Sequence, residues 1–204
     1  MKSLFPALVF AAAIMLVGGT ASATPITFEA DLIGANENPA TPSAGTGTAF
    51  VTIDEALNTM RVQVAFSGLS GTTRASHIHC CEAAPGLNAN IPVATTTPTF
   101  PNFPLGVTSG SYDQTFNLLD TATYNTSPTA DFIAAHGGTV QSAEAALIFG
   151  IENQEAYLNI HTNLFPTGEI RGLLTPVPEP ASLALLATAL VGLGFVRRRR
   201  GSPN

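Results

Sequence analysis

Apolar and polar residues alternate over long stretches of this 204-residue chain. The clearest stretch is residues 60–66, which read Met-Arg-Val-Gln-Val-Ala-Phe, with a large apolar side chain at every second position. Residues 26–32 and 49–53 show the same period of two. Because successive side chains of a strand point to opposite sides, this period predicts antiparallel strands with one buried face.

Shorter segments of the same kind follow along the chain, and turns rich in Gly, Pro and Asn separate them. The turns include residues 36–47 and the Gly-Leu-Ser-Gly sequence at 68–71. The further strand-like segments are residues 76–79, 112–118, 156–162 and 169–174. Many short strands joined by such turns predict a mainly β domain, built as an antiparallel β-sandwich or barrel.

One region departs from the period of two. Residues 129–135 and 141–149 are rich in alanine, and apolar residues in the second segment recur at helical spacing. Gly137 and Gly138 separate the two segments, so we expect one or two short helices here. Residues 81–104, by contrast, hold five prolines and show no clear period, which predicts a long loop.

The N-terminal residues have the pattern of a secretory signal. Lys2 supplies a positive charge, residues 4–17 are mostly apolar, and the Ala-Ser-Ala sequence at 21–23 provides the small residues of a cleavage site. We therefore expect a signal peptide at residues 1–23 and a mature chain that starts at Thr24, outside the cytoplasm.

The C-terminal residues have three parts in a fixed order. A motif of four residues comes first, an uncharged apolar run follows at residues 181–196, and the four arginines at 197–200 come next. The motif consists of Val177, Pro178, Glu179 and Pro180. As a helix the apolar run would be about 24 Å long. The hydrocarbon core of a bilayer is about 30 Å thick and takes roughly 20 helical residues to span, so the run is short for a membrane span. Taken alone, the pattern predicts an ordinary single-span membrane anchor, a hydrophobic helix with its arginines on the cytoplasmic side.

With all three parts in this order, the tail closely resembles the PEP-CTERM sorting signal of Gram-negative bacteria. The resemblance implies that an exosortase, a membrane-embedded cysteine transpeptidase, recognises residues 176–204 and cuts near the Pro-Glu-Pro motif. The precursor would be anchored transiently in the inner membrane and then passed to the cell surface or the extracellular matrix.

Residues 24–175 lie between the two targeting segments and are enough for one domain with a core. They contain thirteen acidic residues and no lysine, and their three basic residues are Arg61, Arg74 and Arg171, which gives a formal net charge of −10. Such a charge repels nucleic acid and anionic membranes. We therefore expect no nucleic acid among the partners.

The two cysteines of the chain are adjacent, at Cys80 and Cys81. A relaxed disulfide needs a longer Cα–Cα distance than the ~3.8 Å of one peptide step. The sequence leaves three states open: a bridge between the neighbours, two thiols, or two ligands of a soft metal ion.

Histidines mark a candidate metal site. His77 and His79 are two residues apart on a predicted strand, so both rings point to one side of it. His161 lies on another predicted strand, in the Tyr-Leu-Asn-Ile-His-Thr segment at 157–162. Three histidines in this arrangement suit a copper or zinc ion. Glu169 and Cys80 are the candidates for a fourth ligand.

The same strands also admit a structural interpretation. A turn after residue 162 would place residues 168–172, Gly-Glu-Ile-Arg-Gly, antiparallel to residues 157–162. The polar side chains of the two strands would then form a partly buried network that fixes their register. The members of this network would be Asn159, His161, Glu169 and Arg171. We expect Arg171 to be at least half buried and bonded to a carboxylate or to backbone carbonyls.

Together these segments resemble the CHRD domain, the module first noticed in chordin. The resemblance rests on Glu-Asn-Pro at 37–39, Phe-Ser-Gly-Leu at 66–69, His-Ile-His at 77–79, and the closing Asn-Ile-His-Thr and Gly-Glu-Ile-Arg-Gly segments at 159–162 and 168–172. It covers nearly all of the domain at 24–175. It implies an extracellular, immunoglobulin-like β-sandwich with no established enzymatic role.

Two functions agree with these observations. The first is a non-enzymatic module of the cell surface or of a biofilm matrix, linked to exopolysaccharide. The second is an extracellular module that binds copper or zinc through His77, His79 and His161. The sequence holds no Gly-x-Ser-x-Gly elbow and no phosphate-binding loop, so we expect no enzymatic activity.

Overall fold

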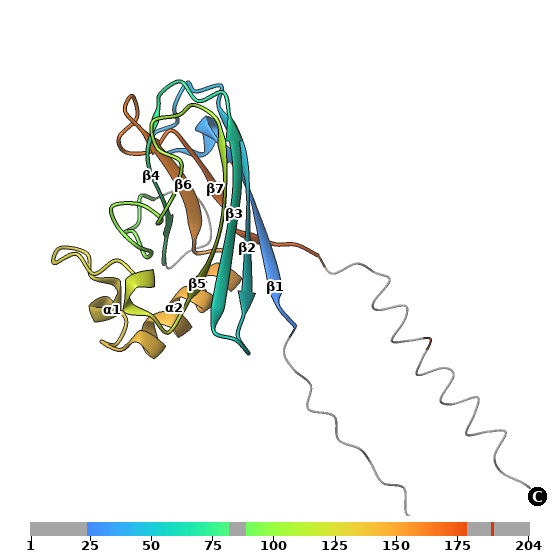
Figure 1. The fold of residues 1–204 in the computed structure, drawn as a ribbon, viewed down its shortest axis with the longest axis vertical. Coiled ribbons are helices and arrows are strands. Elements are labelled where there is room, and N and C mark those ends of the chain that lie inside the picture. The colour runs from blue at the N-terminus through green and yellow to red at the C-terminus, as the bar shows by residue number, and fades with distance from the viewer. Residues whose placement is uncertain (1–23, 82–88, 179–188, 190–204) are drawn as a thin grey trace, which may run out of the picture.

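The computed structural model describes residues 24–81 and 89–178, together with residue 189. This part of the chain consists mainly of strands, with two short α-helices (Figure 1). The strands are β1 (Ile26–Ile33), β2 (Thr46–Asp54), β3 (Thr59–Ser67), β4 (Thr73–His79), β5 (Gly110–Asn117), β6 (Tyr157–Thr162), β7 (Ile170–Leu173) and β8 (Thr175–Pro176). All the strand pairs are antiparallel, so the predicted mainly β domain is confirmed. The expected signal peptide at 1–23 lies outside the described residues.

The strands form one curled sheet in the order β4-β6-β7-β1-β2-β3-β5, and β8 pairs with β1 (Figure 1). β1 joins the two halves, because it pairs with β2 along its whole length and its last residue, Ile33, pairs with Arg171 of β7. Gly172 allows β1 and β7 to approach, since a Cβ atom there would come within 2.4 Å of the Asp31 carbonyl oxygen. The two layers expected of a sandwich are thus the two halves of a single sheet.

The alternation in the sequence determines which residues form the core. Met60, Val62, Val64 and Phe66 are all buried, whereas the three residues between them are at least partly exposed. Inward-facing residues of both halves of the sheet, Ile160 among them, belong to one apolar cluster. Burial of apolar surface contributes roughly 25 cal/mol per Å², so the strands are held by the same pattern that predicts them.

The helical region follows the predicted division. α1 (Phe132–Ala135) and α2 (Val140–Glu152) are separated at residues 137–138, where both glycines have positive φ. Thr139 precedes α2, and its side chain accepts a hydrogen bond from the Ser142 N–H. The Ser142 hydroxyl interacts with the Thr139 backbone in return, so the two residues cap the start of α2. Two shorter 3-10 helices are η1 (Gly34–Asn36) and η2 (Thr121–Thr123).

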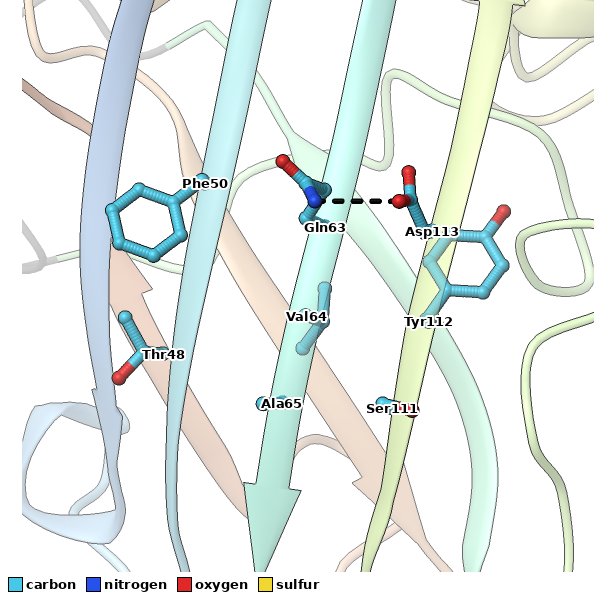
Figure 2. A pocket seen from close by; sticks show the side chains of 8 residues that line it. All are labelled: Thr48, Phe50, Gln63, Val64, Ala65, Ser111, Tyr112 and Asp113. Carbon is cyan, nitrogen blue, oxygen red and sulfur yellow. Dashed lines mark hydrogen bonds between the residues drawn. The ribbon is translucent and has the colours of Figure 1, made fainter.

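The outward face of β2, β3 and β5 forms an open, shallow hollow (Figure 2). Thr48, Phe50 and Gln63 contribute to its lining with hydroxyl, ring and amide groups. The Asp113 carboxylate in the same hollow accepts hydrogen bonds from Arg61, at 2.6 and 2.8 Å, and from Gln63. This face mixes polar and apolar side chains, and the three histidines lie on the other half of the sheet.

The two ends of the domain lie together. The Val177 N–H donates to the Thr27 carbonyl of β1 at 2.9 Å, so the chain leaves the domain beside the strand on which it enters. Val177 and Pro178 of the predicted sorting motif are exposed there, whereas Glu179 and Pro180 lie outside the described residues. Within the described residues, we find no helix with the length and apolar content needed to cross a bilayer.

Candidate metal centre

The pairing of β4 with β6 brings three histidines to one side of the sheet. The directly opposed residues are His77 and Asn159, His79 and Tyr157, and Ala75 and His161. Ile78, Leu158 and Ile160, which alternate with them, lie in the apolar core. Strand alternation therefore explains why the three rings share a side, and strand pairing explains why they are neighbours.

The three imidazole rings converge. One ring nitrogen from each of His77, His79 and His161 lies within 4.8 Å of the other two. The ring centroids are 5.2 Å apart for His77 and His161, 6.0 Å for His77 and His79, and 5.9 Å for His79 and His161. The fold thus brings together the three side chains that the sequence indicates as candidate ligands.

Each ring is held by a backbone carbonyl at its other nitrogen. The three contacts are His77 Nε2 to the Pro98 oxygen at 2.7 Å, His79 Nδ1 to the Ile91 oxygen at 2.7 Å, and His161 Nδ1 to the Pro166 oxygen at 3.0 Å. A carbonyl oxygen accepts hydrogen bonds and cannot donate them, so these nitrogens carry the proton of each neutral ring. Ile91 and Pro98 belong to the long loop that follows β4.

The remaining ring nitrogens are lone-pair acceptors. His77 Nδ1, His79 Nε2 and His161 Nε2 are buried and make no hydrogen bond within the described structure. Burial lowers the pKa of His77 to about 4 and the pKa of His79 to about 3, and it also lowers the pKa of His161. The rings are therefore neutral at neutral pH, which is the form that binds metal ions.

A stack of buried side chains supports His79. The Tyr157 ring lies nearly parallel to the His79 ring, with 4.7 Å between centroids and an interplanar angle of 11°. The guanidinium carbon of Arg171 lies 4.6 Å from the centroid of the Tyr157 ring. Both Tyr157 and Arg171 are fully buried, so the stack fixes the plane of the His79 ring.

Arg171 is surrounded by acceptors. Its Nε donates to the Asn36 carbonyl at 2.6 Å, and its Nη1 donates to Asn90 Oδ1 at 2.9 Å. The same Nε lies 3.7 Å from the carboxylate of Glu37, whose side chain is also buried. Burial raises the pKa of Glu37 to about 7, although the charge of Arg171 opposes this shift. Glu37 is a partner that the sequence does not reveal, except through its place in the Glu-Asn-Pro segment at 37–39.

Glu37 also lies close to Asn159 and Gly168. A Cβ atom at Gly168 would come within 2.6 Å of both Glu37 Oε1 and Asn159 Nδ2. Gly168 has a φ of 134°, a conformation that residues with a side chain avoid. The first glycine of the Gly-Glu-Ile-Arg-Gly segment is therefore required both by the backbone and by the space around Glu37.

Glu169 belongs to a different set of hydrogen bonds. Its carboxylate accepts from the hydroxyls of Ser43 and Thr162 and from the backbone N–H groups of Ser70 and Gly71. Burial alone would raise the pKa of Glu169, but these donors together outweigh burial and lower it. β7 begins at Ile170, so Glu169 lies just before the strand that the sequence predicts to include it.

The four polar residues expected in one network therefore lie in three separate groups. Asn159 and Arg171 meet through Glu37, since both interact with its carboxylate. Glu169 is held by hydroxyl and backbone donors, and His161 belongs to the histidine cluster. The single network of four residues that the sequence predicts is replaced by these separate sets of partners.

Cys80 and Cys81 form a disulfide between neighbours, which is one of the three states that the sequence leaves open. The pair follows His79 directly at the end of β4, and both sulfur atoms lie beside Gly150 of α2. In this state Cys80 has no thiolate to offer as a fourth ligand.

Two comparisons with protein families agree with the fold and with the tail. The CHRD domain model matches residues 28–174, a range that includes the three histidines, Glu37 and Arg171. The model of the PEP-CTERM protein-sorting motif matches residues 176–200. No match was found among curated proteins or among solved structures. The sorting motif marks an exported protein, whose membrane-anchored precursor is processed by an exosortase. Because the first match covers most of its length, the chain belongs to the CHRD domain family.

Proposed function

We propose that this exported CHRD-domain protein binds one copper or zinc ion through His77, His79 and His161. The observation that carries the proposal is the meeting of three buried ring nitrogens, each without a hydrogen-bond partner in the described structure, within 4.8 Å of one another. Neutral imidazole is a preferred ligand of both ions, and three histidines form a known protein ligand set for zinc.

A single cation suits these three nitrogens better than a water molecule does. Water has two O–H donors, so it would leave one buried nitrogen unsatisfied, at a cost of about 1–3 kcal/mol. One cation accepts all three lone pairs. Nitrogens that bind one ion tetrahedrally at 2.0–2.1 Å are about 3.4 Å apart, so nitrogens that lie within 4.8 Å of one another need to draw closer when the ion binds.

The residues around the histidines are of the kind that support metal ligands. Each ring donates its second N–H to a backbone carbonyl, which fixes both the tautomer and the plane of the ring. Behind His79, the stacked Tyr157 and Arg171 keep the ring in place without competing for its free nitrogen. This support favours a ligand role over a general packing role for the three histidines.

We further propose that the protein acts at the cell surface or in the extracellular matrix as a non-enzymatic module associated with exopolysaccharide. The sorting motif and the acidic, lysine-free domain support this place of action. Co-sedimentation of the purified protein with exopolysaccharide from the producing cells tests the association. Protein that stays in the supernatant at every polysaccharide concentration would contradict it.

The metal content of the purified protein tests the proposed site. After equilibration with copper or zinc and dialysis, elemental analysis should find about one ion per chain. Substitution of His77, His79 or His161 by alanine should weaken metal binding by more than about tenfold. Loss of a residue that only supports a ligand already lowers metal affinity by about 10–100-fold, and loss of a ligand itself should cost more.

His136→Ala is the matched control. His136 ends α1 and its Nδ1 contacts the Phe132 carbonyl, outside the cluster, so metal binding should be unchanged. Circular dichroism checks that each variant is folded. If a folded variant that lacks His77, His79 or His161 binds as much metal as the parent does, the proposal is wrong.

A further inference from the structure

We infer that the three-histidine centre holds an open coordination position for a small anion, and that Arg74 draws the anion to it. The inference rests on the proposed metal binding and deepens it by naming a ligand class. Its grounds are the number of protein ligands, a hollow beside the rings and the position of Arg74.

The described residues supply three metal ligands and leave the fourth position open. The group of converging ligands consists of His77, His79 and His161. Glu169 is engaged by four hydrogen-bond donors, and Cys80 is bonded to Cys81. Zinc sites with three protein ligands keep their fourth position for water or substrate. Because all three ligands are neutral, a divalent ion would keep its full charge, which favours an anion at that position.

A hollow in the surface reaches two of the three rings. His77 and His161 form part of its wall, together with Arg74, Asn163 and Pro166. Its volume is about 480 Å³, and it is open to solvent. The hollow therefore gives a small ligand an approach from solvent to the rings of His77 and His161, although the free nitrogens of both rings are themselves buried.

An irregularity in β4 places Arg74 at this hollow. The register of β4 against β6 shifts between Thr73 and Ala75, so Arg74 is the extra residue of a bulge. Bulges of this kind redirect a side chain and are frequent beside functional sites. The exposed Arg74 side chain lines the hollow rather than continuing the row of histidines.

The charge of Arg74 is available to a ligand. Arg61 is paired with Asp113, and Arg171 is paired with Glu37. In the described part of the chain, no carboxylate oxygen lies within 4.0 Å of the Arg74 guanidinium. A guanidinium binds planar anions with two parallel N–H donors, so a small carboxylate or an inorganic monoanion could contact both Arg74 and the bound ion.

The positive charge of Arg74 stands out because the domain as a whole is acidic. With thirteen acidic residues against three arginines, residues 24–175 repel anions in general. An anion therefore needs a local positive region, and the ion held by the histidines and the Arg74 side chain would form one at a single hollow.

Azide titration of the copper(II)-loaded protein tests the inference. Azide bound to copper(II) produces a charge-transfer absorption band, which reports coordination without any assay of activity. The band should grow and saturate with azide. Arg74→Ala should weaken azide binding roughly fivefold, as the loss of an exposed ion pair would, and should leave the copper content unchanged. Arg74→Lys should keep part of the affinity, because it keeps the charge.

Arg61→Ala is the matched control, since it also removes one exposed arginine but far from the hollow, and it should leave azide affinity unchanged. Copper binding without an azide band would overturn the inference and leave the proposed metal site in place. Failure to bind copper would overturn the metal site itself. An azide affinity that is unchanged in Arg74→Ala, or lowered equally in Arg61→Ala, would overturn the role of Arg74.

Discussion

At the scale of single residues, Arg171 links several parts of the domain. It is the largest fully buried side chain of the described residues. From β7 it reaches η1 through the Asn36 carbonyl, the loop after β4 through Asn90, and β6 through the Tyr157 ring. A buried charge is tolerated when it is paired and hydrogen-bonded, and Glu37 with these acceptors meets that condition.

Arg171→Ala should lower the free energy of unfolding by about 3–5 kcal/mol, because Glu37 would stay buried without its counter-charge. Since the pKa of Glu37 is already about 7, the carboxyl group can take up a proton in mild acid. The loss should therefore be larger at pH 8 than at pH 6. Arg171→Lys should recover little, since an ammonium group lacks the forked donors.

Chemical denaturation of these variants measures the effect. Arg61→Ala serves as the control, because Arg61 and Asp113 form an exposed pair and the unfolding midpoint should stay near that of the parent. A parent-like midpoint for Arg171→Ala would show that the buried pair does not stabilise the domain.

Side-chain type and strand alternation were enough to predict part of the site. His77 and His79 share a side because a strand alternates, and Asn159 faces Arg171 because a short turn joins β6 to β7. The carbonyls of Ile91 and Pro98 could not be predicted, because the path of a loop, and not its residue types, determines where its carbonyls point. Glu37 was hidden for a similar reason, since it meets Arg171 through the pairing of β1 with β7 and the path of the segment that follows β1.

At the scale of elements, β4 and β6 hold three neutral imidazoles against one another, and acid should destabilise that arrangement. In an unfolded chain, histidine has a pKa of about 6.5. In the folded chain the pKa is about 4 for His77 and about 3 for His79. Between these values the unfolded chain binds protons that the folded chain does not bind. The stability that these two neutral histidines contribute is therefore present in full above about pH 6.5, and it is lost as the pH falls towards their folded pKa values.

The metal-free protein should accordingly lose stability between pH 6.5 and pH 4, by about 1.4 kcal/mol per pH unit for each of these two histidines. Protonation of Glu37 stabilises the folded state as the pH falls, because its folded pKa of about 7 lies above the unfolded value. This gain offsets the loss from about one histidine. His161, whose pKa is also lowered, adds to the loss.

Urea unfolding at pH 7, 6 and 5 in the presence of a chelator measures this dependence. His77→Gln should make the slope shallower, whereas His136→Ala should leave it as it is in the parent. Stability that stays constant or rises on acidification would contradict the burial of neutral imidazoles. Added zinc should stabilise the protein more at pH 7 than at pH 5, since protons compete for the same nitrogens.

Elements were easier to predict than their ends. The alternation at 60–66 gave β3 with the correct buried side, because apolar burial and strand formation act together there. The predicted strand at 169–174 begins one residue later in the structure, at Ile170. Glu169 thus lies just before the strand, where its carboxylate accepts hydrogen bonds from the hydroxyls of Ser43 and Thr162.

At the scale of the whole molecule, the folded domain and the tail are separate in sequence. The CHRD match ends at residue 174, and the match to the sorting motif begins at residue 176. β8 closes the domain by pairing Thr175 and Pro176 with β1, directly before the Pro-Glu-Pro motif. The histidines and the core of the described residues all precede this point, so cleavage near the motif would remove the targeting residues and leave the proposed metal centre whole.

Intact-mass analysis of protein extracted from the cell surface should therefore show a chain that starts at Thr24 and lacks the arginines at 197–200. Glu179→Ala changes the motif and should hold the full-length precursor in the inner membrane. Thr188→Ala is the matched control, because it leaves both the motif and the apolar character of the run at 181–196 in place. The cleaved protein should bind as much metal per chain as the precursor does, since no ligand lies in the tail. If the parent protein occurs solely at full length in the inner membrane, the tail is a permanent anchor and the sorting interpretation is wrong.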